Sequence, residues 1–286
     1  MSDRVGRALL RTSTLGVFDV RCSAPAGPPG PDESARHTQV ILPLAGVFEV
    51  HHERDSVTAD AGSAVVFGTD HGHRIAHPVT GGDRSLVLMF PEAVAEDALG
   101  ADGPSGGPVG SAVHAGSRAL ASGLARDAFD GFESGELALL LLNAIAADLH
   151  RLPRNASARP DQRDRVERVR ALLASEPERR WRLEDVARAV HCSPFHLARQ
   201  FRALTGTSIS RHLLRLRMAV ALQRLADGER DLAGLAADLG FASQSHFGAR
   251  FRSVFGASPG SVRATLTSGG LAELRTFVTA EGRAVS

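Results

Sequence analysis

Two stretches in the last third of the chain place serine, glycine and arginine where these residues can cap helices and contact a nucleic acid. The first stretch, residues 183–208, contains Arg199, and the second, residues 232–258, contains Arg252. An arginine guanidinium can donate two parallel hydrogen bonds to a guanine edge or to a phosphate. These residue types therefore indicate recognition of DNA.

The two stretches are copies of one pattern. Four positions recur at an offset of 49 residues: Leu183, Val186, Ala187 and Val190 correspond to Leu232, Leu235, Ala236 and Leu239. Seven more recur at an offset of 50 residues: Ser193, His196, Leu197, Phe201, Arg202, Gly206 and Ser208 correspond to Ser243, His246, Phe247, Phe251, Arg252, Gly256 and Ser258. Each copy predicts a short helix, a tight turn and a second helix, which is the helix-turn-helix format.

Local signals support this format in both copies. His191 and Gly240 stand at corresponding turn positions, and both residue types accept a left-handed backbone better than most others. Ser193 and Ser243 are expected to cap the second helix of each copy, and Pro194 suits a first helical position. Further on, Ser208 and Ser258 are expected at helix N-termini, whose free backbone N–H groups can clamp phosphates.

The charge of the chain is divided in the same way. Residues 161–266 hold 18 Arg and 11 Asp or Glu, a net charge of +7. The remaining residues hold 15 Arg and 21 acids, a net charge of −6. All 33 basic residues are arginine. A basic module beside an acidic one indicates a nucleic-acid domain joined to a domain with another task.

The N-terminal part is expected to be a small β-barrel or jelly roll followed by helices. Short apolar runs such as 40–42, 47–50, 64–67 and 85–90 predict strands separated by turns. Segments 24–33 and 100–110 are expected to be loops. Two helices follow at about 117–129 and 136–150, the second capped by Ser134. Its wide apolar stripe predicts packing on the barrel or against a second subunit.

A linker and a central helix complete the predicted organisation. We expect a cupin-like effector and dimerisation domain at 1–152, a linker at 153–162, a DNA-binding domain at 163–266 and a mobile tail at 267–286. A helix at 210–226 should join the two motifs. The fold class is therefore α+β: an N-terminal cupin-like β-barrel with a helical dimerisation segment, and a C-terminal all-α double helix-turn-helix domain.

Residues 163–266 resemble the DNA-binding domain of the AraC/XylS family of transcriptional regulators. The resemblance rests on residues 183–206 and, more specifically, on the run from Gly240 to Pro259. It implies seven helices, two motifs joined by a long helix, and partners that include double-stranded DNA and RNA polymerase. The N-terminal half is similar, more loosely, to the cupin-like effector domain of these regulators, which implies a small-molecule effector.

The resemblance also assigns base-contacting positions. The matching residues are Phe195, Ala198 and Arg199 in the first motif and Gln244, Ser245 and Ala249 in the second. Family members often carry Arg at the position of Ala249, whereas here Arg stands at 250, rotated by about 100° on a helix. We therefore expect Arg250 to contact phosphate or protein. Arg202, Arg252 and His246 complete the expected DNA surface, with His246 either a base contact or a capping or packing residue.

No metal, cofactor or catalytic group is expected. His51 and His52 are adjacent and point to opposite faces of a strand, and His71 and His73 fall in a turn, so the spacing of a cupin metal site is missing. Cys22 has no second cysteine in its domain to support a redox role. The effector residues cannot be named from the sequence.

The preferred interpretation is an effector-controlled, sequence-specific transcription regulator that dimerises through 136–150 and lies in the cytoplasm without a membrane span. We expect activation, although the sequence does not give the sign of regulation. Two alternatives stay open. One is a cupin enzyme fused to a DNA-binding module, which would need a metal triad or a nucleophile–base pair. The other is a constitutive DNA-binding protein whose barrel only dimerises.

Overall fold

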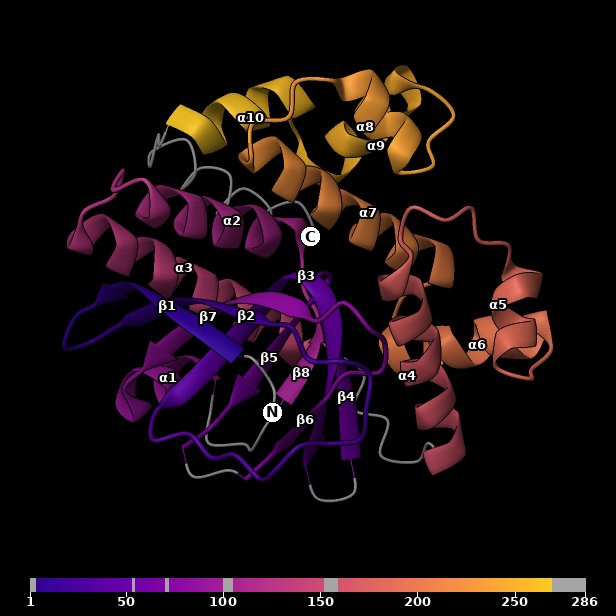
Figure 1. Ribbon diagram of the computed structural model, residues 1–286, viewed down its shortest axis with the longest axis horizontal. Helices are drawn as coiled ribbons and strands as arrows, with labels where there is room; N and C mark the ends of the chain where they lie inside the picture. The colour runs from indigo at the N-terminus through magenta and orange to yellow at the C-terminus, as the bar shows by residue number, and fades with distance from the viewer. Residues whose placement is uncertain (1–3, 53–54, 70–71, 100–104, 152–158, 269–286) are drawn as a thin grey trace.

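The computed structural model describes residues 4–52, 55–69, 72–99, 105–151 and 159–268, and it consists of an antiparallel sheet followed by helices (Figure 1). The strands are β1 Arg4–Arg11, β2 Gly16–Cys22, β3 Thr38–His52, β4 Asp55–Asp60, β5 Ser63–Phe67, β6 Arg74–Ala76, β7 Asp83–Phe90 and β8 Ser105–Pro108. The helices are α1 Glu92–Leu99, α2 Ser111–Ala125, α3 Gly131–His150, α4 Pro160–Ser175, α5 Leu183–Ala189, α6 Pro194–Thr205, α7 Ile209–Ala226, α8 Leu232–Asp238, α9 Gln244–Phe255 and α10 Pro259–Ser268. This order confirms the predicted α+β class.

The sheet is organised around β3. Its strand order is β1-β2-β7-β3-β5-β8, while β4 and β6 pair with the second half of β3. The register of β3 against β7 shifts between Pro43 and Ala45, where Pro43 has no N–H to donate, and Gly46 follows with φ 79°. The strand therefore bends here, and the two strands predicted at 40–42 and 47–50 are one.

The two faces of the sheet belong to different hydrophobic clusters. Leu86 and Leu88 of β7 belong to the cluster under the helices, whereas Val87 between them belongs to a cluster on the other face. Ile41 and Phe48 of β3 also lie on that other face. This alternation follows from the two-residue period of a strand, and it leaves one face covered by helices and the other facing a cavity.

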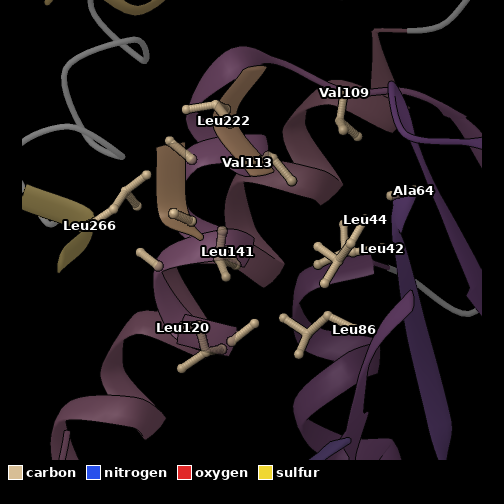
Figure 2. Close-up of a cluster of buried hydrophobic side chains, with 14 of the residues drawn as sticks. Leu42, Leu44, Ala64, Leu86, Val109, Val113, Leu120, Leu141, Leu222 and Leu266 are labelled. Carbon is tan, nitrogen blue, oxygen red and sulfur yellow. The ribbon is translucent and has the colours of Figure 1, made fainter. Parts of the chain in front are cut away.

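The main core extends from the sheet into the second helix-turn-helix motif. Leu86 of the sheet, Leu120 of α2, Leu141 of α3, Leu222 of α7 and Leu266 of α10 are all buried in one cluster, and Figure 2 shows these side chains converging. In Figure 1, α2 lies between the sheet and the α7–α10 layer. The second motif is therefore packed on the N-terminal domain.

The first motif has a hydrophobic core of its own. Val169 of α4, Val186 of α5, Phe201 of α6 and Leu213 of α7 form a separate buried cluster. Helix α7 contributes its first half to this cluster and its second half to the main core. The expected central helix at 210–226 is thus confirmed as α7, and it joins both motifs.

Two predictions about the N-terminal helices were wrong in detail. The first helix begins at Ser111 rather than at residue 117. The second, α3, begins after Asp130, whose carboxylate accepts from the backbone N–H of Glu133 in a capping box, while Ser134 is buried within the helix. Asp130 is the better cap because its side chain precedes the first helical residue, whereas Ser134 already lies in the first turn.

The apolar stripe of α3 faces the inside of this same chain. Leu137, Leu141 and Ile145 have no exposed surface and pack in the main core. The opposite side of α3 carries Phe132 and Leu139, which are 80% and 45% exposed. Of the two predicted partners for the stripe, the barrel domain is therefore the correct one, and a second subunit would meet other residues of α3.

Three predictions, on the linker, on the loop at 100–110 and on the tail, agree with the structure only in part or cannot be compared with it. Helix α4 begins at Pro160, so the last residues of the predicted linker are helical, whereas 152–158 lie outside the described residues. Strand β8 lies within the segment 100–110 that was predicted to be a loop, and it pairs with β5. The predicted tail, apart from the end of α10, also lies outside the described residues.

Candidate nucleic-acid interface

The first motif consists of α5 and α6. Ser193 caps α6, because its hydroxyl accepts from the backbone N–H of His196 at 3.4 Å, and Pro194 is the first helical residue. The helix ends at Gly206, which has φ 71°. The start and stop signals read from the sequence are thus confirmed for this helix.

The second motif, α8 and α9, repeats this construction. Asp231 caps α8 by accepting from the backbone N–H groups of Ala233 and Gly234. Ser243 caps α9 by accepting from the N–H of His246 at 3.1 Å, and Gly256 ends the helix with φ 69°. The two copies therefore share their local geometry as well as their sequence.

The turn between the helices requires a left-handed residue in each motif. His191 has φ 51° and Gly240 has φ 72°, as predicted. At Gly240 a side chain would also meet the protein, since a Cβ there would lie 2.8 Å from the carbonyl oxygen of Glu178. The glycine is therefore required for two independent reasons.

Large apolar residues form one buried face of α6 and of α9, the second helix of each motif. Leu197 and Phe201 of α6 have no exposed surface, and neither do Phe247 and Phe251 of α9. The rings of Phe251 and Phe255 lie 4.5 Å apart between centroids. These contacts fix the rotation of each helix about its axis, and thereby determine which residues face outward.

The outward face of α6 carries an aromatic side chain and two arginines. Phe195 is 79% exposed, and Arg199 and Arg202 are exposed as well. Residues spaced by four and three positions lie on the same side of a helix, so these three side chains share a face. Ala198 is half-buried beside them. Phe195 therefore lies outside the core and is available for contact with a partner.

The outward face of α9 is more polar. Ser245, Ala249 and Arg252 are exposed at spacings of four and three residues, so they share a face. Gln244 and Arg250 are exposed on its flanks. Ala249 is short, and Arg250 is displaced around the helix. This face therefore carries one arginine, Arg252, whereas the outward face of α6 carries two.

His246 lies at the start of α9 and is exposed, yet its ring also packs against the protein. The imidazole meets the ring of Phe241 edge-on, with 5.6 Å between centroids. Of the two predicted roles, the structure displays the packing contact. The exposed edge of the ring remains accessible for a second role.

The arginines of the two outward faces differ from other arginines of the helical part. Arg188 of α5 pairs with Asp185 at 3.0 Å, and Arg224 of α7 pairs with Glu229 and Asp238. Across the described part of the chain, no acidic side chain forms an ion pair with the arginines of these faces, which are Arg199, Arg202, Arg250 and Arg252. Their positive charge is available to an anionic partner.

The two helix N-termini predicted to clamp phosphate are formed as expected. Ser208 caps α7 by accepting from the N–H of Arg211 at 3.2 Å, and Ser258 accepts from the N–H of Ser261 at 3.1 Å at the start of α10. Ser208 is exposed and Ser258 is half-buried. Each start leaves further backbone N–H groups of its first turn directed outward.

Arg217 of α7 joins the two motifs, a role that the sequence did not predict. Its Nε donates to the carbonyl of Pro177 at 2.8 Å and its Nη2 to the carbonyl of Arg179 at 2.9 Å, both in the segment between α4 and α5. On its other side the guanidinium lies 5.7 Å from the ring of Phe241, next to the turn of the second motif. No spacing pattern distinguishes Arg217 from its neighbours.

A buried charge cluster connects the sheet to α4 and α7, which pack against the first motif. The guanidinium of Arg170 in α4 lies 3.4 Å from the carboxylate of Asp60 at the end of β4, and His212 of α7 lies 3.3 Å from the same carboxylate. Glu167 accepts from Arg170 at 3.1 Å and from the backbone N–H of Thr58 at 2.7 Å. Burial by itself raises the pKa of Asp60, but the charges of Arg170 and His212 outweigh it and hold that pKa below its ordinary value.

The uncovered face of the sheet contains a cavity of about 160 Å³. Its apolar part is formed by Val20, Ile41, Phe48, Ile75 and Val87. Polar groups stand around them, among them an ion pair between Arg4 and Glu33 and the side chains Cys22, His77, Asp83 and Ser85. The cavity combines a hydrophobic floor with a few polar groups, as small-molecule sites do.

The crowded histidines of the N-terminal domain separate in the structure. His73 stacks on Phe67 with 3.9 Å between ring centroids, and Nδ1 of His52 lies 2.6 Å from the carbonyl oxygen of Gly72. His51 lies 3.3 Å from Glu49. These histidines therefore take part in different local contacts, and among the described histidines only His77 lines the cavity.

Comparison with known proteins agrees with this geometry in both halves of the chain. The family model described as an AraC-binding-like domain matches residues 7–174, and a helix-turn-helix domain model matches residues 186–265. The chain belongs to the AraC family. The first match covers the sheet from β1 onward and helices α1–α4 almost completely, and the second runs from within α5 to within α10.

Individual relatives of this AraC-family chain match about a third of it. An AraC-like transcription regulator from Streptomyces lividans is 33% identical over 91 residues, which cover 32% of this chain and 30% of that protein. Regulatory protein PocR from Salmonella typhimurium is 33% identical over 82 residues, covering 29% of this chain and 27% of that protein. The matches thus span about a third of each curated relative.

A solved structure covers more of the AraC-family chain at lower identity. ToxT from Vibrio cholerae O395 is 13% identical and matches 90% of this chain and 99% of its own, with a TM-score of 0.36. Within the part of the chain that the structure describes, no helix combines the length and the apolar character needed to cross a membrane.

Proposed function

We propose that this protein regulates transcription by binding double-stranded DNA through α6 and α9, under the control of a small molecule that binds in the sheet cavity. The single observation that carries the proposal is the pair of matched helix-turn-helix motifs whose outward arginines have no acidic partner among the described residues. Such helices enter successive major grooves.

The first motif supplies most of the base discrimination. Phe195 can contact a thymine methyl group, and Arg199 can donate two hydrogen bonds to a guanine. Ala198 lies between them as a short side chain that allows close approach. In the second motif, Gln244, Ser245 and Ala249 face the bases. Arg202, Arg250 and Arg252 are placed to contact phosphates, together with the helix starts at Ser208 and Ser258.

The effector is a small, mostly apolar molecule with at least one polar group. A cavity of about 160 Å³ is comparable with the engineered cavity of about 150 Å³ that accepts benzene, so a ligand of one ring size fits. The apolar floor supplies affinity, and the polar groups around it supply orientation.

The effector signal reaches the DNA-binding helices by two routes. The buried Asp60–Arg170–His212 cluster connects β4 to α4 and α7, and the main core connects the sheet to α7 and α10 through α2. A ligand that binds better to one domain arrangement shifts the population toward it. This distinguishes the proposal from a constitutive DNA-binding protein whose sheet domain only dimerises.

Membership of the family supports the remaining parts of the proposal. We propose that the protein activates transcription by contacting RNA polymerase, that it acts in the cytoplasm where the DNA is, and that it is a regulator and not an enzyme. We also propose a homodimer through the 136–150 region, with the exposed side of α3, including Leu139, as the contact surface.

The experiment that tests DNA binding is a titration of the full chain with DNA from its own upstream region at several salt concentrations. If about 6–10 phosphates are contacted, the affinity falls by about three to five orders of magnitude between about 50 and 200 mM salt. The variant Arg202→Ala should reduce the salt slope by about one. Arg188→Ala is the matched control, since Arg188 is already paired with Asp185, and it should leave the slope unchanged. A slope near zero in the wild type contradicts the proposal.

The effector is tested separately through the melting temperature of the full chain. One-ring aromatic and aliphatic acids, amides and alcohols are screened for a rise in melting temperature. An active compound should lose its effect in Ile75→Trp, which fills the cavity, and should change DNA affinity in the wild type. A compound that raises the melting temperature without changing DNA affinity would favour the constitutive alternative.

A further inference from the structure

Three side chains with metal-ligating atoms meet at the polar side of the cavity. The ligating atoms of Cys22, His77 and Asp83 all lie within 4.8 Å of one another. All three side chains line the cavity. The spacing of the histidines in the sequence does not predict this set, because it contains only one of them.

Strand pairing brings the three residues together. Cys22, the last residue of β2, is directly opposite Asp83, the first residue of β7. His77 follows β6, and its carbonyl accepts from the backbone N–H of Gly27 at 3.1 Å. Gly82 has φ 68°, and a Cβ there would lie 1.8 Å from the carbonyl oxygen of Cys22. The backbones of β2 and β7 therefore approach more closely here than a larger residue would allow, which holds the Cys22–Asp83 pair in place.

The donor set has the chemistry of a zinc site. A thiolate, an imidazole and a carboxylate are the three protein ligand types that Zn²⁺ binds, at about 2.0–2.3 Å. In a tetrahedral site, those bond lengths separate the ligand atoms by about 3.3–3.7 Å. His77 Nε2 and Asp83 Oδ1 lie 2.9 Å apart, so the two side chains need to separate by less than about 1 Å when an ion replaces the shared proton.

The surroundings of the three residues also fit an ion. The side chains of His77 and Asp83 are 7% and 8% exposed, and a carboxylate buried to this extent needs a compensating positive charge or hydrogen bonds. The hydroxyl of Ser85 donates to the second oxygen of Asp83 at 2.9 Å. Such an outer hydrogen bond orients a ligating carboxylate in metal sites. Three protein ligands leave a fourth coordination position, which here faces the cavity.

We propose that Cys22, His77 and Asp83 bind one divalent zinc-type ion at the polar side of the cavity. As the ion binds, the thiol proton of Cys22 passes into solvent, and Nε2 of His77 gives up its proton, so that the ligand is a neutral imidazole protonated on Nδ1. The fourth coordination position of the ion holds water or an anionic group of a molecule in the cavity. The site belongs to this chain's own strands and does not depend on whether α6 and α9 bind DNA.

The experiment measures metal binding by the full chain without DNA. The purified protein is treated with a chelator, separated from it, and titrated with Zn²⁺ in competition with a chromogenic chelator. Co²⁺ is used in parallel, because a thiolate ligand gives cobalt a charge-transfer band and tetrahedral geometry gives strong visible bands. We expect one equivalent of metal per chain and a thiolate band that disappears in Cys22→Ser.

Four variants separate this site from other metal-binding groups. Cys22→Ser and His77→Gln should weaken Zn²⁺ binding by at least about a hundredfold, and Ser85→Ala by about tenfold, the lower end of the effect of an outer hydrogen bond. Cys192→Ser, which changes the cysteine of the first motif, should have no effect. Circular dichroism of each variant confirms that it is folded, and Ser85→Ala provides a mild variant if His77→Gln is unstable.

Two outcomes overturn the proposal. One is the absence of a thiolate band in the cobalt-loaded wild type. The other is Zn²⁺ binding that is unchanged in Cys22→Ser and lost in His51→Gln or His52→Gln, which would place the ion on β3. Since neither measurement involves DNA or an effector, failure here leaves the proposed function untouched, and failure of DNA binding leaves the metal site untouched.

Discussion

Arg170 of α4 and Asp60 of β4 lie 3.4 Å apart, with side chains that are 5% and 0% exposed. An ion pair of this kind stabilises a structure only while both partners are present, because a single buried charge is costly. The pair therefore links the end of β4 to α4, which packs against the first helix-turn-helix motif. The pair also restricts how α4 can lie against the sheet, because the two buried charges must stay close to each other.

Replacing Asp60 should be strongly destabilising. Asp60→Ala leaves the buried Arg170 with Glu167 as its remaining acidic partner and removes the carboxylate beside His212, and the free energy of unfolding should fall by up to about 3–5 kcal/mol. Urea unfolding of the full chain measures this change. Asp185→Ala is the control, since its partner Arg188 is 77% exposed, and it should cost no more than about 1 kcal/mol. Equal effects of the two variants would mean that the buried pair is not coupled to folding.

Stability should decrease on acidification because of His114. Burial, followed by the charge of Arg118, lowers the pKa of His114 to about 3 from its ordinary value of 6.5. Since the folded state binds the proton less readily than the unfolded state, stability is complete above pH 6.5 and decreases as the pH falls from 6.5 toward 3. The maximal slope from this one group is about 1.4 kcal/mol per pH unit.

The measurement is chemical unfolding at a series of pH values between about 4 and 7.5, the range in which an ordinary histidine and the unfolded chain take up the proton. His114→Gln should flatten the decrease relative to the wild type, whereas His37→Gln, at an exposed position, should leave it unchanged. A wild-type profile that His114→Gln does not alter would assign the acid sensitivity to other groups.

Two glycines of the second motif should respond to alanine in opposite directions. Gly240→Ala places a Cβ at φ 72° and 2.8 Å from the carbonyl of Glu178, and it should cost at least about 1–2 kcal/mol. At Gly248 the nearest atom to a Cβ is 4.0 Å away, so Gly248→Ala should stabilise α9 by up to about 1 kcal/mol. Thermal unfolding of both variants checks the signs. Destabilisation by Gly248→Ala would indicate that this glycine is needed for a contact outside the described residues.

Arg199 and Arg250 should differ in how they affect DNA recognition. Arg199→Ala should cost about 1–3 kcal/mol at the operator and relax the preference at one base, because a bidentate contact to guanine is lost. Arg250→Ala should weaken binding evenly across sequences, as loss of a phosphate contact does. Binding-site selection with both variants and the wild type distinguishes these effects. If Arg250→Ala changed the base preference while Arg199→Ala did not, the assignment of the two helices would be wrong.

The proposed dimer is tested at two leucines of α3. Leu139 is 45% exposed, so Leu139→Glu should weaken dimerisation and leave the chain folded. Leu141 has no exposed surface, and Leu141→Glu should unfold the protein by placing a charge in the main core. Sedimentation combined with circular dichroism reports both properties. A folded dimer of Leu139→Glu would locate the interface elsewhere.

The features predicted best from the sequence are those that depend on neighbouring residues. The cap at Ser193, the left-handed turn at His191 and the end of α6 at Gly206 are each determined within a few positions of the chain. The repeat then showed that the same local choices occur twice. The exposure of Arg199 on α6 and of Arg252 on α9 follows from the same local pattern.

Features that depend on distant pairing were missed. The alignment of Cys22 with Asp83 comes from the register of β2 and β7, and the contact of Asp60 with Arg170 comes from the packing of α4 on β4. No short-range pattern specifies either arrangement. The apolar stripe of α3 was recognised, but its pattern alone could not say whether the barrel or a second chain covers it.

The shared hydrophobic core has a consequence for how the protein unfolds and how it can be divided. Leu222 and Leu266 belong to the DNA-binding half by sequence, yet they are buried together with Leu42 and Leu120 of the N-terminal half. The second motif and the sheet should therefore behave as one cooperative unit in hydrogen exchange, with α6 exchanging separately. Cutting the chain at the predicted linker would expose an apolar surface on α7 and α10. The two sides of that linker should therefore not fold independently of each other.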